Sequence, residues 1–240
     1  MHALILAGGQ GLRLRPLTLD KPKPMVPLNG KPIAEWQIEW LGANTDLESV
    51  TFLCGYKWER LKEHFGTNFR GADIAYSVEK QPLGTGGAIR KGIVARGGSG
   101  EVVILNGDLV TRMNLREMIR SGRSAPIRPA VTMLLVPFRS RFGIIRFDNK
   151  NVVQRFEEKP DLPDMWINGG IYIADSKRLL KHLPEKGDIE REAFPKLAER
   201  REILAHPYSG FWVAIDSMKD LGEAEAELKA KPARRAKQHL

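Results

Sequence analysis

A short apolar run that leads directly into a glycine-rich, cationic loop constrains this chain more than any other feature. The run ends at Ala7 and is bounded by glycine, which predicts a fully buried β-strand. Gly8, Gly9 and Gly11 follow it. In α/β proteins, a glycine-rich turn at the carboxyl end of the first strand presents backbone N–H groups to an anion. The sequence therefore predicts an α/β fold with an anion-binding loop after its first strand.

This loop fits neither of two common phosphate-binding motifs. A dinucleotide-binding fingerprint would need a third glycine where Leu14 stands, and the chain has no Gly-Lys-Ser or Gly-Lys-Thr triplet for a Walker loop. Instead the loop carries Arg13 and Lys23 among several prolines, which fix φ angles and stiffen the segment. Arg13 can bind a fork of phosphate oxygens and Lys23 supplies a point charge, so the loop suits a triphosphate.

Residues 8–27 resemble the signature of the sugar-1-phosphate nucleotidyltransferases, G-G-x-G-x-R-L-x-P-L-T-x-x-x-P-K-P-M-x-P, and the resemblance covers roughly residues 1–222. It implies a Rossmann-like, three-layer, mostly parallel sheet with helices on both faces and a small antiparallel subregion on the sugar side. It also implies a transferase that makes a nucleotide sugar and pyrophosphate from a nucleoside triphosphate and a sugar 1-phosphate, with Mg²⁺ as cofactor. Arg13 and Lys23 would then be catalytic, and the nucleotide would be bound by Leu6, Ala7, Gly8, Gly9 and Gly11.

A second motif, Glu79 to Ala88, follows a predicted strand and opens a predicted helix, so it should lie across the carboxyl edge of the sheet. In the family, the P-L-G-T-x-G segment lines the base and ribose pocket. Guanine offers two donors side by side, which suits a carboxylate, whereas a pyrimidine edge suits an amide or the backbone. The implied nucleotide-binding residues here are Glu79, Gln81, Pro82, Gly84 and Gly86.

Two acidic residues are candidates for the metal site. Asp108 follows a predicted buried strand and a glycine, where a carboxylate can hold Mg²⁺ against phosphates, and it matches the Gly-Asp motif of the family. Many relatives carry the second acid two residues after a tryptophan, where this chain has Ala214. The cytidylyltransferase branch places that acid further on, which matches Asp216. We therefore expect Asp216 to be the second ligand, unless the register follows the other branch.

Residues 156–160 and 167–172 resemble the segments with which the family grips the sugar. By this resemblance Glu158 accepts hydrogen bonds from sugar hydroxyls and Lys159 pairs with the sugar phosphate. The remaining sugar-phosphate residues that the resemblance implies are Asn106, Gly143, Asn168 and Gly169. The reaction itself needs positioning and charge neutralisation rather than a protein nucleophile, because the attacking phosphate is already an anion.

The sequence is compatible with more than one pair of substrates. The N-terminal half is most similar to guanylyltransferases for mannose or heptose 1-phosphate, which predicts GTP and a sugar of that type. The C-terminal motifs also resemble glucose-1-phosphate cytidylyltransferases, so cytidylyl, thymidylyl or uridylyl transfer to glucose 1-phosphate or a related sugar is the alternative. A rival of another class is a catalytically silent regulatory homologue that only binds a nucleotide sugar. Arg13, Lys23 and Asp108 oppose the silent alternative, whereas Ala214 favours it.

Composition agrees with an enzyme for small anionic substrates. The formal net charge is +9, and five cations with no aromatic residue lie in residues 229–240, which predicts a basic tail without nucleic-acid binding. No run of about 18 apolar residues occurs, so we expect no membrane span. The single cysteine fits a reducing, cytoplasmic location. The expected partners are the two substrates, and a homo-oligomer is left open.

Strands and helices alternate in the first half, which predicts βαβ units. The expected elements are strands at 49–54, 73–78 and 101–106, with helices at 32–41, 57–65, 86–96 and 114–121, the last capped by Asn114. Strands at 131–136, 144–147, 152–156 and 166–174 should extend the sheet and add a small antiparallel piece over a cleft, before helices at 188–200 and 218–230. We divide the chain into one domain, 1–228, with a nucleotide half (1–128) and a sugar half (129–228), and a tail (229–240).

Overall fold

β1 (His2–Ala7) lies in the middle of the main sheet, which explains why it is apolar on both faces. It pairs in parallel with β4 (Ser49–Cys54) on one side and β7 (Glu101–Asn106) on the other. The computed structural model describes residues 1–140 and 142–230, and within them this sheet has the order β13-β9-β12-β7-β1-β4-β6-β5. The remaining strands of this sheet are β5 (Asn68–Phe69), β6 (Ala72–Val78), β9 (Val131–Arg139), β12 (Asp161–Asp175) and β13 (Ile203–Pro207).

The centre of the sheet is parallel, and this brings distant loops to one edge. β6 pairs in parallel with β4, and β13 with β9, whereas β12 runs antiparallel to both β7 and β9 and β5 runs antiparallel to β6. Because parallel strands end at the same edge, the loops that follow β1, β4 and β7 all begin there. The sheet therefore gathers the glycine-rich loop and Asp108 on one side of the molecule.

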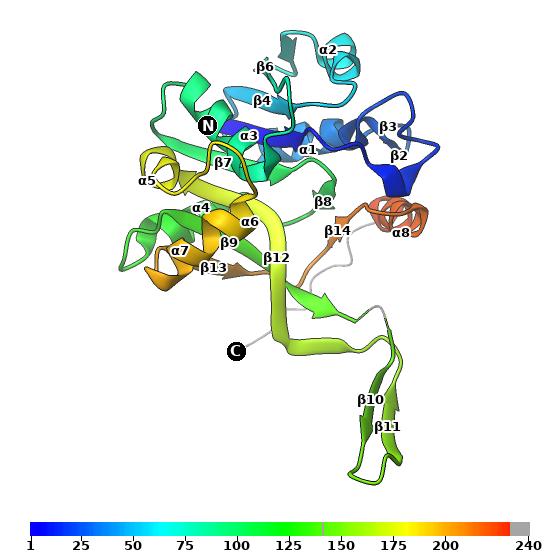
Figure 1. Ribbon diagram of the computed structural model, residues 1–240. Coiled ribbons are helices and arrows are strands. Elements are labelled where there is room, and N and C mark those ends of the chain that lie inside the picture. The colour runs from blue at the N-terminus through cyan, green and yellow to red at the C-terminus, as the bar shows by residue number, and fades with distance from the viewer. Residues whose placement is uncertain (141, 231–240) are drawn as a thin grey trace.

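Helices cover both faces of the sheet, as predicted (Figure 1). Ile5 of β1 joins a core cluster with α1 (Ile33–Asn44), α2 (Glu59–Phe65) and α4 (Leu115–Ser124), whereas the adjacent Leu4 joins a cluster with α3 (Gly84–Ala95). This alternation follows from the two-residue period of a strand. The helices that complete the second face are α5 (Ser176–Leu180), α6 (Ile189–Glu192) and α7 (Phe194–Glu199).

Most predicted elements are confirmed within one to a few residues, and the differences have local causes. The helix predicted at 188–200 is two short helices, α6 and α7, with a break at Ala193 just before Pro195. Asn114 caps α4, as predicted, because its side chain accepts a hydrogen bond from the backbone N–H of Arg116 at 3.1 Å. The short strands β5, β8 (Leu109–Thr111), β13 and β14 (Trp212–Ala214) were not predicted.

One part of the second half leaves the body of the protein. β10 (Ile144–Phe147) and β11 (Val153–Glu157) form a two-stranded antiparallel ribbon, which the sequence predicted as a cover over a cleft. In Figure 1 this ribbon instead projects away from the sheet, beyond the start of β12. We call residues 142–159 the arm.

α8 (Met218–Lys229) is the last element of the described chain, and most of the predicted basic tail, residues 231–240, lies outside the described residues. No helix in the described ranges is long and apolar enough to cross a membrane.

The single cysteine is a core residue in a strand. Cys54 is buried at the end of β4, and burial, reinforced by the negative charges of Glu79 and Glu59, raises the pKa of its thiol to about 12. The reactive thiolate is therefore scarce at neutral pH.

We predict that Cys54 in the native protein reacts with a thiol-specific chromogenic disulfide at pH 8 about a thousandfold more slowly than in denaturant, since both thiolate fraction and access fall on burial. The measurement is the absorbance change with time, with the urea-unfolded chain as the control for one reactive thiol per molecule. Rapid stoichiometric labelling of the native protein would show that the thiol is not held in the core.

Candidate functional site

Three charged residues from distant parts of the chain meet at the carboxyl edge of the sheet. The ammonium of Lys23 lies 2.5 Å from Oδ2 of Asp108 and 2.6 Å from Oδ1 of Asp216. All three side chains are largely buried, with Lys23 only 15% exposed. A buried carboxylate pair needs a compensating cation, so each member of this cluster depends on the others. The sequence placed these residues in one site, and the structure brings them into direct contact.

The register of two short strands determines which acid faces Lys23. β14 pairs antiparallel with β8, so that Ala214 lies opposite Leu109, and the N–H of Ile215 donates to the backbone oxygen of Asp108 at 2.7 Å. This pairing carries the chain past Ala214 and delivers Asp216 beside Asp108. The position that many relatives use for an acid is therefore a strand residue here, and Asp216, the predicted second ligand, lies beyond it on the segment that follows β14.

Glycine at position 107 permits this close approach. A Cβ atom there would lie 2.1 Å from the backbone oxygen of Leu6 and 2.7 Å from the ring of Pro24. The end of β7 thus lies directly against the end of β1 and the lysine-bearing turn. Any larger residue at Gly107 would push Asp108 away from Lys23.

The cationic loop is held by apolar anchors rather than by its charges. The loop begins at Gly11, whose φ of +61° is left-handed and whose carbonyl accepts from the hydroxyl of Thr18 at 2.8 Å. The turns η1 (Leu12–Leu14) and η2 (Lys23–Met25) follow. Leu14 and Val26 are fully buried in a cluster with Ile215 before α8. The cluster fixes the loop backbone, so Lys23 can be held in place while Arg13 reaches solvent.

Arg13 is two-thirds exposed, and one guanidinium nitrogen lies 2.9 Å from Oδ1 of Asp216. The same carboxylate oxygen therefore faces both predicted catalytic cations. The site thus holds two cations, Arg13 and Lys23, that could turn from the carboxylates to the oxygens of a polyphosphate.

The two carboxylates could supply some, but not all, of the ligands of a magnesium ion. No group of three or more acidic, histidine or cysteine side chains in the described ranges is arranged to hold a metal ion. Mg²⁺ in nucleotide enzymes is commonly bound by one or two carboxylates, with substrate phosphates and water completing the shell. Asp108 and Asp216 already converge on one cation, the Lys23 ammonium, so the donor set is suitable for Mg²⁺ together with a bound triphosphate.

Some of the predicted nucleotide-binding residues are neighbours in the structure. Oε1 of Glu79 lies so close to Gly8 and Gly55 that a Cβ at either glycine would approach it to within 2.9 Å. Its Oε2 accepts from the backbone N–H of Leu83 at 3.0 Å. Glu79 is thus fixed over the start of the glycine-rich loop. Leu6, Ala7, Gly9 and Gly11 are continuous with that start at the end of β1.

The glycines of the second motif have a packing role. The backbone N–H groups of Gly86 and Gly87 both donate to the carbonyl of Gly187, at 2.9 and 3.2 Å. Gly84 has a φ of +74°, and a Cβ there would lie 2.5 Å from the same oxygen. These contacts lock the start of α3 against the segment before α6. Gln81 and Pro82, which precede this contact, remain exposed.

The predicted sugar residues fall into two groups. Asn168 and Gly169 lie on β12, where Asn168 pairs with Leu135 of β9. Asn168 accepts from the N–H of Gly170 at 2.9 Å and donates to the hydroxyl of Tyr172 at 2.7 Å. Asn106 lies against Gly170, and its side-chain oxygen is buried without a hydrogen-bond partner in the described part of the chain. An unpaired acceptor at the sheet edge suits a ligand hydroxyl.

The second group lies on the arm. The ammonium of Lys159 is 3.2 Å from Glu158, and both side chains are more than half exposed. A Cβ at Gly143 would lie 3.1 Å from Glu158, so these three predicted residues are neighbours. Figure 1 places the arm well away from the carboxyl ends of β1 and β7. The structure therefore brings together the predicted sugar residues within each group, but it separates the two groups.

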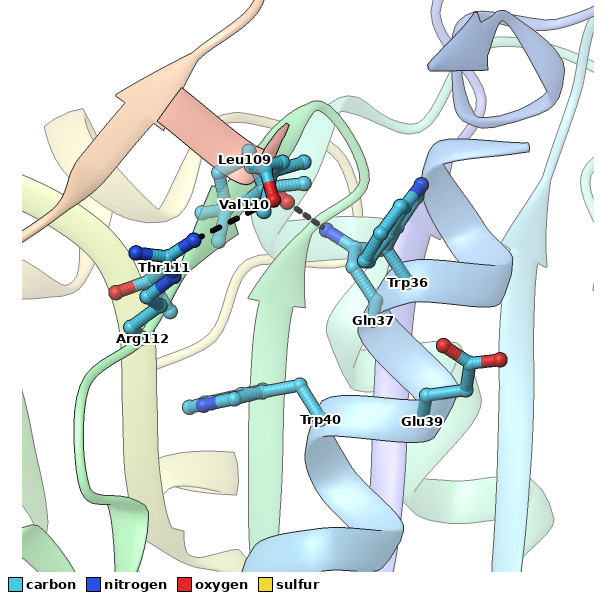
Figure 2. A pocket seen from close by; sticks show the side chains of 9 residues that line it. Trp36, Gln37, Glu39, Trp40, Leu109, Val110, Thr111 and Arg112 are labelled. Carbon is cyan, nitrogen blue, oxygen red and sulfur yellow. Dashed lines mark hydrogen bonds between the residues drawn. The ribbon is translucent and has the colours of Figure 1, made fainter. Parts of the chain in front are cut away.

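Gln37, which supports the site from behind, was not among the residues predicted from the sequence. Its side-chain nitrogen donates to the backbone oxygens of Asn106 and Leu109, both at 2.8 Å, and Gln37 is 2% exposed. Figure 2 shows the side chain extending from α1 to the Leu109 carbonyl. Gln37 thus clamps both ends of the turn that carries Asp108. A polar residue at a core-facing position of an otherwise apolar helix face is the only signal that could have found it.

A pocket of about 280 Å³ opens beside Gln37, between α1 and β8 (Figure 2). The tryptophans Trp36 and Trp40 of α1 line it, together with Leu109 and Arg112. The indole N–H groups donate to the backbone oxygens of Leu28 and Met113. Arg13, Lys23, Asp108 and Asp216 are all absent from the lining of this pocket, so it is separate from the predicted triphosphate site.

Comparison with known proteins gives a consistent result. A family profile described as "Nucleotidyl transferase" matches residues 2–231. The D-glycero-alpha-D-manno-heptose 1-phosphate guanylyltransferase of Aneurinibacillus thermoaerophilus is 33% identical over 231 residues, covering 95% of this chain and 98% of that protein. The mannose-1-phosphate guanylyltransferase catalytic subunit beta of Drosophila melanogaster is 32% identical over 91% of this chain, which spans only 60% of that protein's length.

Solved structures show the same fold. The crystal structure of HddC from Yersinia pseudotuberculosis complexed with GMP-PN has a TM-score of 0.73 and 25% identity, covering 95% of this chain and 99% of that one. A glucose-1-phosphate thymidylyltransferase described as putative, from Bacillus anthracis, has a TM-score of 0.75 at 21% identity, covering 98% of both chains.

We predict that Gln37→Leu weakens Mn²⁺ binding in the presence of nucleoside triphosphate by about 10- to 100-fold, because a freed turn no longer holds Asp108 in place. The matched control is Trp40→Phe, which removes another hydrogen bond from α1 to a backbone oxygen, that of Met113, without touching the turn. Electron paramagnetic resonance of free Mn²⁺ measures both, and thermal unfolding checks that the two variants lose similar stability. Equal metal affinities in the two variants would remove Gln37 from this role.

Proposed function

The chain belongs to the nucleotidyl transferase family, and we propose that it transfers a guanylyl group from GTP to a manno-configured sugar 1-phosphate, of mannose or heptose type. The product pair is then a GDP-sugar and pyrophosphate. That the protein is a sugar-1-phosphate nucleotidyltransferase follows from its relatives. The choice of guanine and of a manno sugar is the finer step that needs a test.

The observation that supports this choice best is the full-length similarity to a heptose 1-phosphate guanylyltransferase, at 33% identity over 95% of this chain. The mannose-1-phosphate guanylyltransferases are about equally similar, and this chain spans about 60% of their length. Both named sugars share the manno configuration. Glu79, held beside Gly8, is consistent with guanine, since a carboxylate can accept from the two neighbouring donors of that base.

In the proposed reaction, an oxygen of the sugar 1-phosphate forms a bond to the α-phosphorus of GTP. The bond from that phosphorus to the oxygen bridging the β-phosphate breaks, and pyrophosphate leaves with this oxygen and its electron pair. No protein group has to donate or accept a proton, because the attacking phosphate is an anion near neutral pH. The barrier arises mainly from bringing two anions together in line, so catalysis depends on positioning and charge.

The residues around Lys23 would supply both the positioning and the positive charge. The glycine-rich loop after β1 offers backbone N–H groups to the triphosphate, while Arg13 and Lys23 provide the positive charge. Arg13 is exposed enough to reach a phosphate, and Lys23 needs only to turn from the carboxylates towards a phosphate oxygen. In this proposal residues 1–128 hold the nucleotide and residues 129–228 hold the sugar, with Asn106 offering its unpaired oxygen to a sugar hydroxyl.

Asp108 and Asp216 are the residues that would hold Mg²⁺. When bound there, the ion would offset negative charge that builds up on the phosphates during transfer. The carboxylates have a second role without the ion, since they keep the Lys23 ammonium at the edge of the sheet. Removal of divalent metal with a chelator should therefore abolish turnover while leaving the fold intact.

We expect pyrophosphate release with GTP and mannose 1-phosphate or D-glycero-D-manno-heptose 1-phosphate to exceed release with ATP, CTP, UTP or dTTP by at least about 100-fold in kcat/KM. The measurement is a coupled pyrophosphate assay over five nucleotides and three sugar phosphates, glucose 1-phosphate included. Arg13→Ala, which should lose at least about 100-fold in kcat, shows that the activity belongs to this site, and Arg15→Ala in the same loop is its matched control.

Two outcomes of that panel would contradict the proposal. Preferred turnover of CTP or dTTP with glucose 1-phosphate would assign the protein to the other branch. No turnover with any pair, together with tight binding of a GDP-sugar, would identify a silent nucleotide-sugar-binding homologue.

A further inference from the structure

The Lys23 ammonium lies at the oxygens that a metal ion would use. It is 2.5 Å from Oδ2 of Asp108 and 2.6 Å from Oδ1 of Asp216, the two predicted metal ligands. Mg²⁺ binds carboxylate oxygens at about 2.1 Å, so an ion held by these same two oxygens would lie against the ammonium. Two cations this close repel strongly, most of all where little water separates them. The lysine and a divalent ion therefore compete for one pair of oxygens.

Solvent weakens this competition only in part. The side chains of Lys23, Asp108 and Asp216 are 15%, 26% and 23% exposed. Water and salt screen ion pairs between fully exposed side chains, but they screen partly buried pairs much less. A metal ion that replaced the ammonium would leave this cation without its two carboxylates, and an uncompensated charge at this depth is costly. A metal ion alone brings nothing that offsets this cost.

The backbone and the glycine-rich loop keep the lysine at this position. The carbonyl of Lys23 accepts from the N–H of Val26 at 3.0 Å in the turn η2, and the adjacent Pro24 is buried. The stem of the lysine packs against the loop, because a Cβ at Gly11 would lie 3.3 Å from the Cβ of Lys23. The same side chain thus borders the two carboxylates and the loop that is predicted to hold the triphosphate.

The charges at this site already balance. A guanidinium nitrogen of Arg13 lies 2.9 Å from the same Oδ1 of Asp216, so two cations and two carboxylates are in direct ionic contact, without net formal charge. A divalent ion gains less Coulomb energy from a balanced cluster than from two carboxylates that lack a counter-ion. A triphosphate changes this balance, because its oxygens can take over both cations.

We propose that Lys23 is an internal counter-ion that opposes metal binding until a triphosphate draws it away. In the free protein the ammonium competes with divalent metal for Asp108 and Asp216. A bound triphosphate attracts the ammonium to its own oxygens, and this frees the carboxylates for the ion. The inference rests on the proposed role of the two aspartates as metal ligands, but not on the choice of guanine or of the sugar.

This arrangement couples the two ligands beyond their direct contact with each other. Whatever factor the triphosphate adds to the metal affinity by removing the lysine, the metal adds to the triphosphate affinity, because binding free energies are reciprocal. Metal therefore binds well only together with a polyphosphate, and it does not occupy the carboxylates in advance.

The first test is Mn²⁺ binding without nucleotide, measured by electron paramagnetic resonance of the free ion. Lys23→Met removes the ammonium but keeps an unbranched side chain, and it should bind one Mn²⁺ at least about 10-fold more tightly than the wild type. The matched control is Lys21→Met, which removes the same charge from the same loop. Lys21 pairs with Asp20 at 3.9 Å, so this variant should bind Mn²⁺ as the wild type does.

Two further measurements locate the ion and guard against misfolding. Adding Asp108→Asn to Lys23→Met should remove the gained affinity. Mg²⁺ at about 10 mM should raise the thermal midpoint of Lys23→Met but not that of the wild type, since a ligand of the folded state stabilises it. If Lys23→Met does not fold, Lys23→Gln keeps N–H donors for the carboxylates and gives the same comparisons.

The second test follows the ammonium itself, by ¹H–¹⁵N spectroscopy of the lysine side chains in the wild-type protein without metal. The signal that is missing from Lys23→Met identifies Lys23. GTP, CTP, dTTP and inorganic tripolyphosphate are added in separate samples, and at least one of them should shift this signal. A shift with CTP but not with GTP would count against guanine and still support the inference.

Three results would overturn the inference: equal Mn²⁺ affinity of Lys23→Met and the wild type, a gained affinity that survives Asp108→Asn, or an ammonium signal that no triphosphate moves. A pyrophosphate assay that rejects GTP and the manno sugars would contradict the proposed function without altering any of these three measurements. The failure of one proposal is therefore distinguishable from the failure of the other.

Discussion

The contact of one lysine with two aspartates is the interaction on which the site depends. Lys23, Asp108 and Asp216 come from three separated segments, and the ammonium lies within 2.6 Å of both carboxylates. Two carboxylates that both contact one ammonium would repel one another if that cation were absent. The charge balance therefore explains why the cationic loop, the turn after β7 and the segment before α8 must be present together.

Apolar packing turns that charge balance into a rigid site. Leu14, Val26 and Ile215 are fully buried in one cluster beneath the loop, so the backbone on either side of Lys23 is fixed before any ligand arrives. Gln37 fixes the turn after β7 from the opposite side through two backbone oxygens. Groups positioned in advance lose little entropy when they meet a phosphate, which is how such a site favours an in-line transfer.

The sequence predicted the features that depend on local pattern and missed those that depend on tertiary pairing. The buried strands at 49–54 and 101–106 were predicted to the residue, because an apolar run bounded by turn residues indicates both ends of a buried strand. Asp216 was predicted only through resemblance, since its position depends on the register of β14 against β8. Gln37 was missed because its partners are backbone oxygens about seventy residues away. The ribbon was predicted but its position was not, because no local signal says which surface a strand pair covers.

A crystal structure of the protein with Mg²⁺ and a non-hydrolysable GTP analogue tests the central claim most directly. The account predicts the triphosphate along the loop from Gly8 to Arg13, Mg²⁺ bound by Asp108 and Asp216, and the Lys23 ammonium moved from the carboxylates to a phosphate oxygen. A metal bound without Asp216, or a triphosphate bound in the pocket beside Trp36 and Trp40 instead, would contradict it.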